Sequence, residues 1–84
     1  MKLKDILTAA KHDTKICITI VSKTELSRQE YINLNNPLPP KALLEMDSVV
    51  EILDADIDFI QSSFHSDLES NCIYPTLEIF VYSK

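Results

Sequence analysis

The sequence predicts one small α+β domain: a short N-terminal helix packed on a small, mostly antiparallel sheet of three to four strands, with a second short helical segment. Three observations support this prediction: apolar residues at helical spacing near the start, two runs rich in β-branched residues, and a proline-rich link between those runs. With 84 residues, the chain fits a single domain over 1–84. Its hydrophobic fraction of 45%, with 25% charged residues, is typical of a chain that folds.

The first quarter of the chain predicts a helix followed by a strand. Apolar residues recur at helical spacing, at Leu3, Ile6, Leu7 and Ala10. After a polar turn, the run 15–23 (KICITIVSK) is rich in β-branched residues, which favour strands. Because this run is apolar on both faces, we expect it in the middle of the core.

Prolines organise the middle of the chain. The segment 31–34 (YINL) is compatible with a second strand that returns antiparallel to the first. The prolines between 37 and 40 predict an extended link, since each ring removes an amide donor and restricts the residue before it. Strong helix formers over 41–46 predict the second helical segment, which 47–48 should close. The segment 49–53 then returns to β composition.

In the second half of the chain, the sequence does not decide the secondary structure of one segment. A rough period-two alternation places Asp54, Asp56 and Asp58 on one face. The segment 59–70 has apolar residues at helix-compatible spacing and one pair with capping-box spacing, but little helix could follow, so both helix and strand stay open. It is equally open whether Phe59, Phe64 and Tyr74 fill the core or form an exposed patch. The alternating run 76–83 (TLEIFVYS) predicts a terminal strand.

The chain contains no glycine, which excludes several motifs. An average usage of about 7% would place about six glycines in a chain of this length. Phosphate-cradling loops, dinucleotide fingerprints and nucleophile elbows depend on glycine for tight turns and close backbone approach. Left-handed turn positions must therefore fall to Asn or Asp, and the candidates are Asp13, Asn35, Asn36 and Asn71.

The reactive side chains form no recognisable catalytic or metal-binding pattern. Cys17 and Cys72 lack CxxC spacing and lie in apolar stretches, so buried free thiols are favoured over a disulfide. A reactive cysteine needs partly exposed, electropositive surroundings, which neither stretch provides. His12 and His65 lie too far apart to indicate a zinc site, and the aspartates of 54–58 lack the glycine and glutamate of a calcium loop. We therefore expect no enzymatic activity, no metal and no cofactor.

Charge is distributed unevenly along the chain. Residues 1–23 carry five lysines against two acids, a balance of +3, whereas 45–69 carry eight acids and no Lys or Arg, a balance of −8. A surface this acidic repels nucleic acid and attracts basic protein surfaces. The predicted partner-binding residues are Glu51, Asp54, Asp56, Asp58, Asp67 and Glu69. The competing interpretation, which is the commoner one for such charge runs, is a solvated face that keeps a small protein soluble.

The order of elements gives one family resemblance. An LKDIL helix, a polar turn and a β-branched strand precede PPKALLEMDSVVEI and a closing LEIFVY strand. This order resembles small phage and prophage proteins of uncharacterised function over most of the chain, without an invariant chemical motif. The segment 59–74 departs from that pattern, in which a short turn joins the last two strands. The resemblance implies an origin in a mobile element, where small acidic proteins commonly block host machinery, and it carries over no site residue.

These observations predict a small acidic protein-binding module of phage or mobile-element origin. Its sharpest form is an inhibitor that docks on a basic, nucleic-acid-binding site of a host protein, as an anti-restriction or anti-CRISPR protein does. We expect a cytoplasmic protein, in the host cytoplasm if it is phage-encoded, without membrane association or direct nucleic-acid binding. The alternative is a structural or assembly protein that forms a homodimer or larger homo-oligomer through strand edges such as 76–83.

Overall fold

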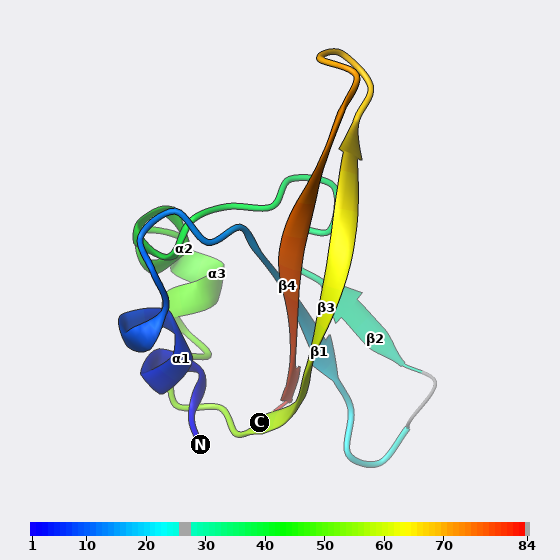
Figure 1. Cartoon of the computed structure of the whole chain (residues 1–84). Coiled ribbons are helices and arrows are strands. Elements are labelled where there is room, and N and C mark those ends of the chain that lie inside the picture. Colours follow the sequence, from blue (N-terminus) through cyan, green and yellow to red (C-terminus); the bar gives the residue numbers. More distant parts are fainter. Residues whose placement is uncertain (26–27, 84) are drawn as a thin grey trace.

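The computed structural model describes residues 1–25 and 28–83 and has the α+β fold that the sequence predicts. Among these residues, three short helices lie on one side of a four-stranded sheet (Figure 1). The elements are α1 (Leu3–Ala9), β1 (Ile16–Val21), β2 (Gln29–Tyr31), α2 (Pro40–Leu44), α3 (Asp47–Val50), β3 (Ile57–Asp67) and β4 (Cys72–Tyr82). Their order across the sheet is β2-β1-β4-β3, with β1 and β4 parallel and the two outer pairs antiparallel.

β1 forms the centre of the core, as its apolar run predicts. Ile16 and Ile18 on β1 are fully buried, and so are Ile79 and Val81 on the neighbouring β4. The parallel register pairs Ile18 with Ile79, which places these side chains in one layer beneath the helices. Burying an isoleucine side chain of this size contributes roughly 1.5–3 kcal/mol, so this layer stabilises the fold most.

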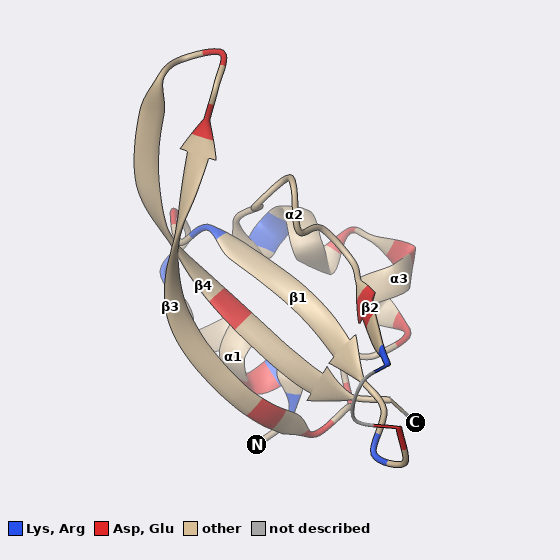
Figure 2. Cartoon of the chain, turned by 90° about the vertical axis from the view of Figure 1, so that its right-hand side faces the viewer, with Lys and Arg blue, Asp and Glu red and all other residues tan. Residues whose placement is uncertain are grey.

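The two faces of the sheet differ in what covers them. We call the side that carries Ile16 and Ile18 the helix face, because it packs against the helices. The opposite side carries Cys17, Thr19 and Val21 and has no helix over it in Figure 2, so we call it the open face. Side chains alternate along a strand and paired residues share a face, so the registers assign the regularly paired strand residues to one face or the other.

α1 follows the predicted helix and fixes the N-terminal segment beside the sheet. Leu3 and Leu7, one turn apart, are buried in the core. The Lys2 amide donates to Asp5 Oδ2 at 3.0 Å, which satisfies a backbone donor at the helix start. The Leu3 amide donates to the Ala55 carbonyl oxygen at 3.0 Å. The start of α1 is therefore held next to the start of β3.

The second helical segment is longer than the sequence predicts. α2 begins at Pro40, whose fixed φ and missing amide suit the first position of a helix. The turn expected at 47–48 is instead the start of α3, and 49–53, expected to return to β structure, continue as helix and turns. Packing explains the difference, because one helical turn buries Val49 fully in the core and leaves Val50 half exposed.

The segment that the sequence leaves open, 59–70, folds mainly as β3. This strand pairs with β4 along nearly its whole length, with one bulge between Ile57 and Phe59. Pairing satisfies the backbone groups that the two strands point towards each other, and this outweighs the helix-compatible spacing of the apolar residues. At the hairpin turn, Asn71 has a φ of 56°, so one of the candidate Asn and Asp residues does take a left-handed position.

β4 is an interior strand, which corrects the expectation that 76–83 offers an exposed edge. It pairs with β1 on one side and with β3 on the other. The last pair with β1 joins Ile16 and Leu77, so the β3–β4 hairpin continues beyond the rest of the sheet. We call residues 63–76 the arm and the remainder the body. Figure 1 shows the arm projecting from the body.

Candidate functional site

The six acidic residues predicted to form one surface fall into two groups. The body group lies between the end of α3 and the start of β3, and the tip group lies at the end of the arm (Figure 2). The body group is Glu51, Asp54, Asp56 and Asp58, and the tip group is Asp67 and Glu69. At about 3.3 Å per strand residue, Asp58 and Asp67 lie roughly 30 Å apart along β3. One flat partner surface does not bring all six together.

Most of the body group is engaged within the chain. Lys2 Nζ lies 2.7 Å from Asp56 Oδ1, and Lys4 Nζ lies 3.1 Å from Asp54 Oδ1. The Tyr82 hydroxyl donates to Asp58 Oδ1 at 2.6 Å. The basic start of the chain therefore lies against the acidic segment and neutralises part of it. Separate balances for 1–23 and 45–69 do not reveal this contact, because they treat the two segments as independent.

These contacts also shift the ionisation of the groups involved. The hydrogen bond and charge of Lys2 hold the pKa of Asp56 below its usual value, and the same pair raises the pKa of Lys2. Hydrogen bonding to Asp58 raises the pKa of Tyr82. Both members of the Lys2–Asp56 pair are about half exposed, so water screens their attraction.

The tip group is arranged differently. The Glu69 amide donates to Asp67 Oδ1 at 3.1 Å, which folds the turn around the carboxylate. Hydrogen bonds from Ser70 and from this amide hold the pKa of Asp67 below its usual value, so it stays charged at neutral pH. Within the residues that the structure describes, no Lys or Arg forms an ion pair with Asp67 or Glu69. The tip therefore presents its charge to solvent.

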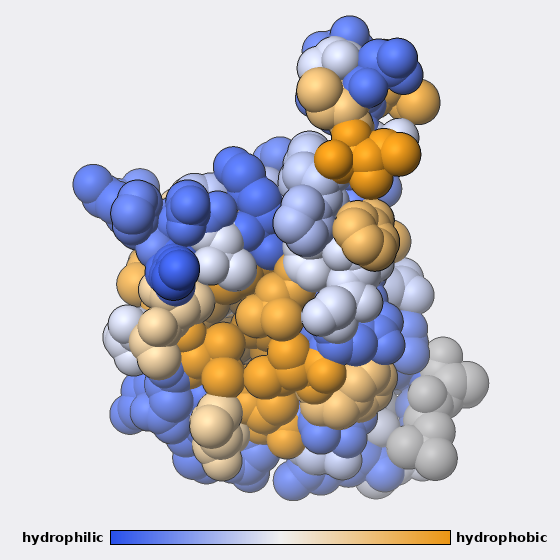
Figure 3. Space-filling model, viewed as in Figure 1, coloured by the Kyte–Doolittle hydropathy of each residue, from blue (hydrophilic) through white to orange (hydrophobic). Residues whose placement is uncertain are grey.

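The arm also carries large apolar side chains outside the core. Phe64 is 76% exposed, Leu68 91% and Ile73 73%. Phe64 pairs with Pro75 and lies on the helix face, which the helices do not reach at this height. Figure 3 shows apolar side chains gathered between the helices and the long strands, and again on the arm. The open question about the aromatic residues is thus settled for Phe64, which belongs to an exposed patch.

Sequence reasoning missed Leu68 and Ile73 as surface residues. An apolar residue is normally assigned to the core, and nothing in the local pattern says that the hairpin continues beyond β1. The predicted strands, 15–23 and 76–83, have similar lengths and gave no signal of this extension. In the structure, the six-residue β1 covers only about half of the eleven-residue β4. Three of the five β4 residues beyond that overlap, Ile73 among them, are exposed.

The open face of the sheet carries a row of aromatic side chains. Phe59 and Phe80 stack with ring centroids 4.2 Å apart, and His65 lies 5.4 Å from the ring of Tyr74. Phe59 is 45% exposed, so its stack lies at the surface. Stacked pairs of this kind contribute about 0.5–1.5 kcal/mol beyond burial. Both contacts join β3 to β4 across the open face.

The two cysteines occupy different environments. Both are free, as expected, but only Cys17 is buried, whereas Cys72 is exposed near the end of the arm. Burial raises the pKa of the Cys17 thiol, with a smaller contribution from the charge of Glu78. The thiol lies 3.8 Å from the carbonyl oxygen of Leu34, as a weak donor. A raised pKa makes Cys17 a poorer nucleophile.

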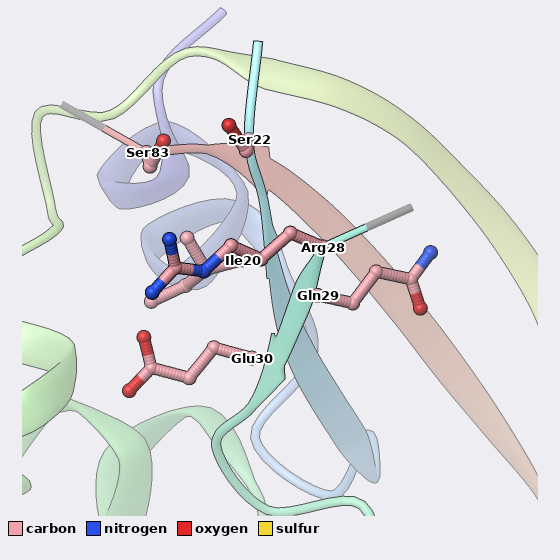
Figure 4. A pocket seen from close by; sticks show the side chains of 6 residues that line it. All are labelled: Ile20, Ser22, Arg28, Gln29, Glu30 and Ser83. Atoms are coloured by element: carbon pink, nitrogen blue, oxygen red, sulfur yellow. The ribbon is translucent and has the colours of Figure 1, made fainter. Parts of the chain in front are cut away.

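A pocket of about 550 Å³ lies beside β2, lined by Ile20, Ser22, Arg28, Gln29, Glu30 and Ser83. Figure 4 shows Arg28 and Glu30 projecting to the same side of β2 as Ile20, and Gln29 to the other side. The lining combines one cation, one carboxylate and two hydroxyls, and contains neither His nor Cys. The lining therefore offers neither serine a histidine that could activate it for nucleophilic attack.

No family model, curated protein or solved structure matches this chain. The resemblance to phage and prophage proteins therefore stays a prediction. In the part of the chain that the structure describes, no group of three or more His, Cys, Asp or Glu side chains is placed to hold a metal ion. No helix among the described residues is long and apolar enough to cross a membrane.

Proposed function

We propose that this chain is a small acidic protein-binding module that engages a basic surface of its partner with the tip of the arm. The observation that carries the proposal is the arm itself: Phe64, Leu68 and Ile73 are each more than 70% exposed and make no part of the core. Apolar side chains gathered on a projecting element are typical of an interaction site. A hairpin held only by its own pairing can enter a concave surface.

The electrostatics favour the tip over the body as the acidic contact. Asp67 and Glu69 form no ion pair with Lys or Arg among the described residues, whereas Asp54 and Asp56 already face Lys4 and Lys2. A partner's cation gains most from carboxylates that no other cation neutralises. The centre of the proposed surface therefore moves from the body group, which the sequence favoured, to the tip group.

Apolar and acidic groups at the tip have complementary roles. Leu68 lies between Asp67 and Glu69 in the turn, so an anchor side chain is flanked by two charges. In protein interfaces, apolar anchors supply most of the affinity, while surrounding charges set orientation and the rate of encounter. This combination selects a partner with an apolar depression bordered by Lys or Arg.

Basic surfaces of that kind commonly bind nucleic acid, so a protein that binds nucleic acid is the partner that fits the tip best. The chain acts as an inhibitor that occupies a nucleic-acid site of a host protein, as an anti-restriction or anti-CRISPR protein would. The net charge of −5 supports this form, because it favours approach to a basic site and opposes binding to nucleic acid itself. Capture that excess DNA or RNA displaces would support the inhibitor form.

Affinity capture with paired charge-reversal variants tests the proposal. Tagged protein is incubated with bacterial lysate, washed at low and then high salt, and the bound proteins are identified by mass spectrometry. We expect capture at low salt that Asp67→Lys with Glu69→Lys abolishes. The matched control, Glu45→Lys with Asp47→Lys, changes the net charge equally but lies on the body. If the control loses the captured protein and the tip variant retains it, the tip is not the binding site.

The apolar anchor is tested separately against any protein captured in this way. Truncation of a buried interface anchor costs about 2 kcal/mol or more, which weakens binding more than tenfold. We expect Leu68→Ser to have this effect, measured by calorimetry with the purified partner. Leu34→Ser removes a 40% exposed leucine from a body loop and should leave the affinity unchanged. Equal affinities for both variants would show that Leu68 is not an anchor.

A further inference from the structure

β3 is an edge strand of unusual length. Among residues 1–25 and 28–83, β3 pairs with β4 on one side and no strand pairs with its other side, whereas the opposite edge strand, β2, has only three residues. β3 has eleven residues and contains no Lys, Arg or Pro, which are the residues that most often protect edges from pairing. Its free side is therefore open to another strand.

Hydrogen bonds around β4 show which β3 residues face that free side. The Tyr82 amide donates to the Asp56 carbonyl, so the backbone N–H and C=O groups of even-numbered β4 residues point towards β3. The Leu77 amide donates to the Lys15 carbonyl, so those of odd-numbered β4 residues point towards β1. The register pairs these even residues with odd residues of β3, such as Glu78 with Gln61. Backbone groups alternate along a strand. The groups that point to the free side therefore belong to Ile60, Ser62, Phe64 and Ser66.

The free stretch has defined ends. At its start, the Ile57 amide donates to the Met1 carbonyl at 3.1 Å, so the N-terminal segment occupies the edge there. At its far end, β3 stops at Asp67, before the hairpin turn. The unoccupied stretch thus runs over 58–66, and its middle residue is Ser62. A stretch that is centred on one outward-facing residue can pair with itself about a two-fold axis.

We propose that β3 pairs antiparallel with β3 of a second copy of this chain, about a two-fold axis at Ser62, to give one continuous eight-stranded sheet. In this register Ser62 lies opposite Ser62 of the partner subunit. Ile60 lies opposite Phe64 of the partner subunit, and all of these residues have outward-pointing backbone groups. Main-chain hydrogen bonds therefore form at each of these pairs.

Side chains favour this register over its neighbours. On the helix face, Ile60 meets the partner's Phe64, and aromatic pairs with β-branched residues are among the favourable cross-strand contacts. A shift by two residues places Phe64 opposite the partner's Ser62 in one direction and the partner's Asp58 in the other. On the open face, Phe59 meets the partner's His65, which joins the Phe59–Phe80 stack to the partner's His65–Tyr74 contact. Both faces thus gain contacts from one register.

The charges of β3 are compatible with the same pairing. Its two acids, Asp58 and Asp67, lie at the ends of the strand: the register places Asp58 opposite the partner's Ser66, and Asp67 lies just outside the paired stretch. Neither carboxylate is opposite another. The other long strand shows a contrast: Pro75 lies where β4 extends beyond β1, and its missing N–H would point to the β1 side. Pro75 therefore interrupts main-chain pairing along the β4 edge of the arm, whereas no proline interrupts it along the β3 edge.

This pairing goes beyond the proposed function, because it uses the edge of β3 and leaves the turn at the tip outside the paired stretch. The two proposals also respond oppositely to salt. Screening weakens capture by Asp67 and Glu69, but it strengthens association of two chains that each carry a net charge of −5. Failure of one is therefore distinguishable from failure of the other.

Sedimentation equilibrium with two single-lysine variants tests the pairing. The purified chain should have the mass of a dimer at high concentration. Ser62→Lys should shift it to the mass of one chain, because it places two ammonium groups opposite each other on the axis. Ser66→Lys makes the same change on the same edge, far from its own copy, and should remain dimeric. A monomer at all concentrations, or a dimer that survives Ser62→Lys, would overturn the proposal.

Disulfide cross-linking tests the register independently, in a Cys72→Ser background that removes the exposed native thiol. Opposed residues in a hydrogen-bonded antiparallel pair have Cα atoms about 5.5 Å apart, within the range that a disulfide spans. With oxidised glutathione as the oxidant, Ser62→Cys should form a covalent dimer as two glutathiones are released. Ser66→Cys should not cross-link. Equal cross-linking of the two variants would exclude the two-fold axis at Ser62.

Discussion

Asn33 is the buried polar residue that ties the loop after β2 to the centre of the sheet. Its Oδ1 accepts from the Ile18 amide at 2.9 Å, and its Nδ2 donates to the Ile16 carbonyl at 2.8 Å. These are backbone groups of β1 on the side towards the short β2, which does not reach them. The side chain substitutes for a longer strand.

Removing this side chain leaves the buried Ile18 amide without its acceptor, whereas the Ile16 carbonyl keeps the Leu38 amide as a donor. We expect Asn33→Ala to lower the free energy of unfolding by about 1–3 kcal/mol, measured by urea denaturation. Asn35→Ala, at an exposed position in the same loop, should change it by less than about 0.5 kcal/mol. Equal effects of the two substitutions would mean that Asn33 has no special structural role.

The Lys2–Asp56 pair predicts a pH dependence with a definite sign. Because the pKa of Asp56 is lowered from 3.8 in the folded chain, its contribution is present above 3.8 and is lost as the pH falls through the lowered value. The raised pKa of Lys2 keeps it present up to 10.5. We expect Asp56→Asn to be slightly less stable than the natural chain between these limits and equally stable in strong acid. Parallel stability profiles at all pH values would contradict this.

At the scale of elements, local patterns predicted some parts and missed others for physical reasons. α1 and β1 were predictable, because helical spacing and β-branched residues each agree with the final packing. α3 was not, since Val49 and Val50 favour a strand locally while one helical turn packs better. β3 stayed open because its partner, β4, follows later in the sequence, and pairing decided between helix and strand.

The turn of the arm depends on one left-handed residue. Asn71 has a φ of 56°, a conformation that costs residues with an ordinary Cβ about 1–2 kcal/mol and glycine almost nothing. We expect Asn71→Ala to destabilise the hairpin by roughly that amount and Asn71→Gly to be nearly neutral, judged by chemical shifts of the arm and by unfolding. A more disruptive glycine variant would show that the Asn71 side chain matters more than its backbone.

At the scale of the whole molecule, the sequence could predict that the candidate site is acidic, but not which acidic residues form it. The sequence correctly identified an acidic segment and a basic one, but their contact across Lys2–Asp56 and Lys4–Asp54 depends on how the N-terminus is placed beside β3. Asp67 and Glu69, which form no ion pair with Lys or Arg among the described residues, and the exposed Leu68 stand out only when the hairpin is known to extend past β1. Composition shows that a segment is charged, and the topology determines which of its carboxylates are accessible to a partner.

As proposed above, the long hairpin is an interaction element whose free β3 edge pairs with a second copy of the chain. Amide hydrogen exchange along β3, measured by NMR at low and high protein concentration, tests whether this edge pairs. Gln61 and Ser63, which bond to β4, should be protected at both concentrations. Ile60, Ser62 and Phe64 should become protected only at high concentration, as their amides enter the dimer. Fast exchange of these three amides at every concentration would contradict the claim.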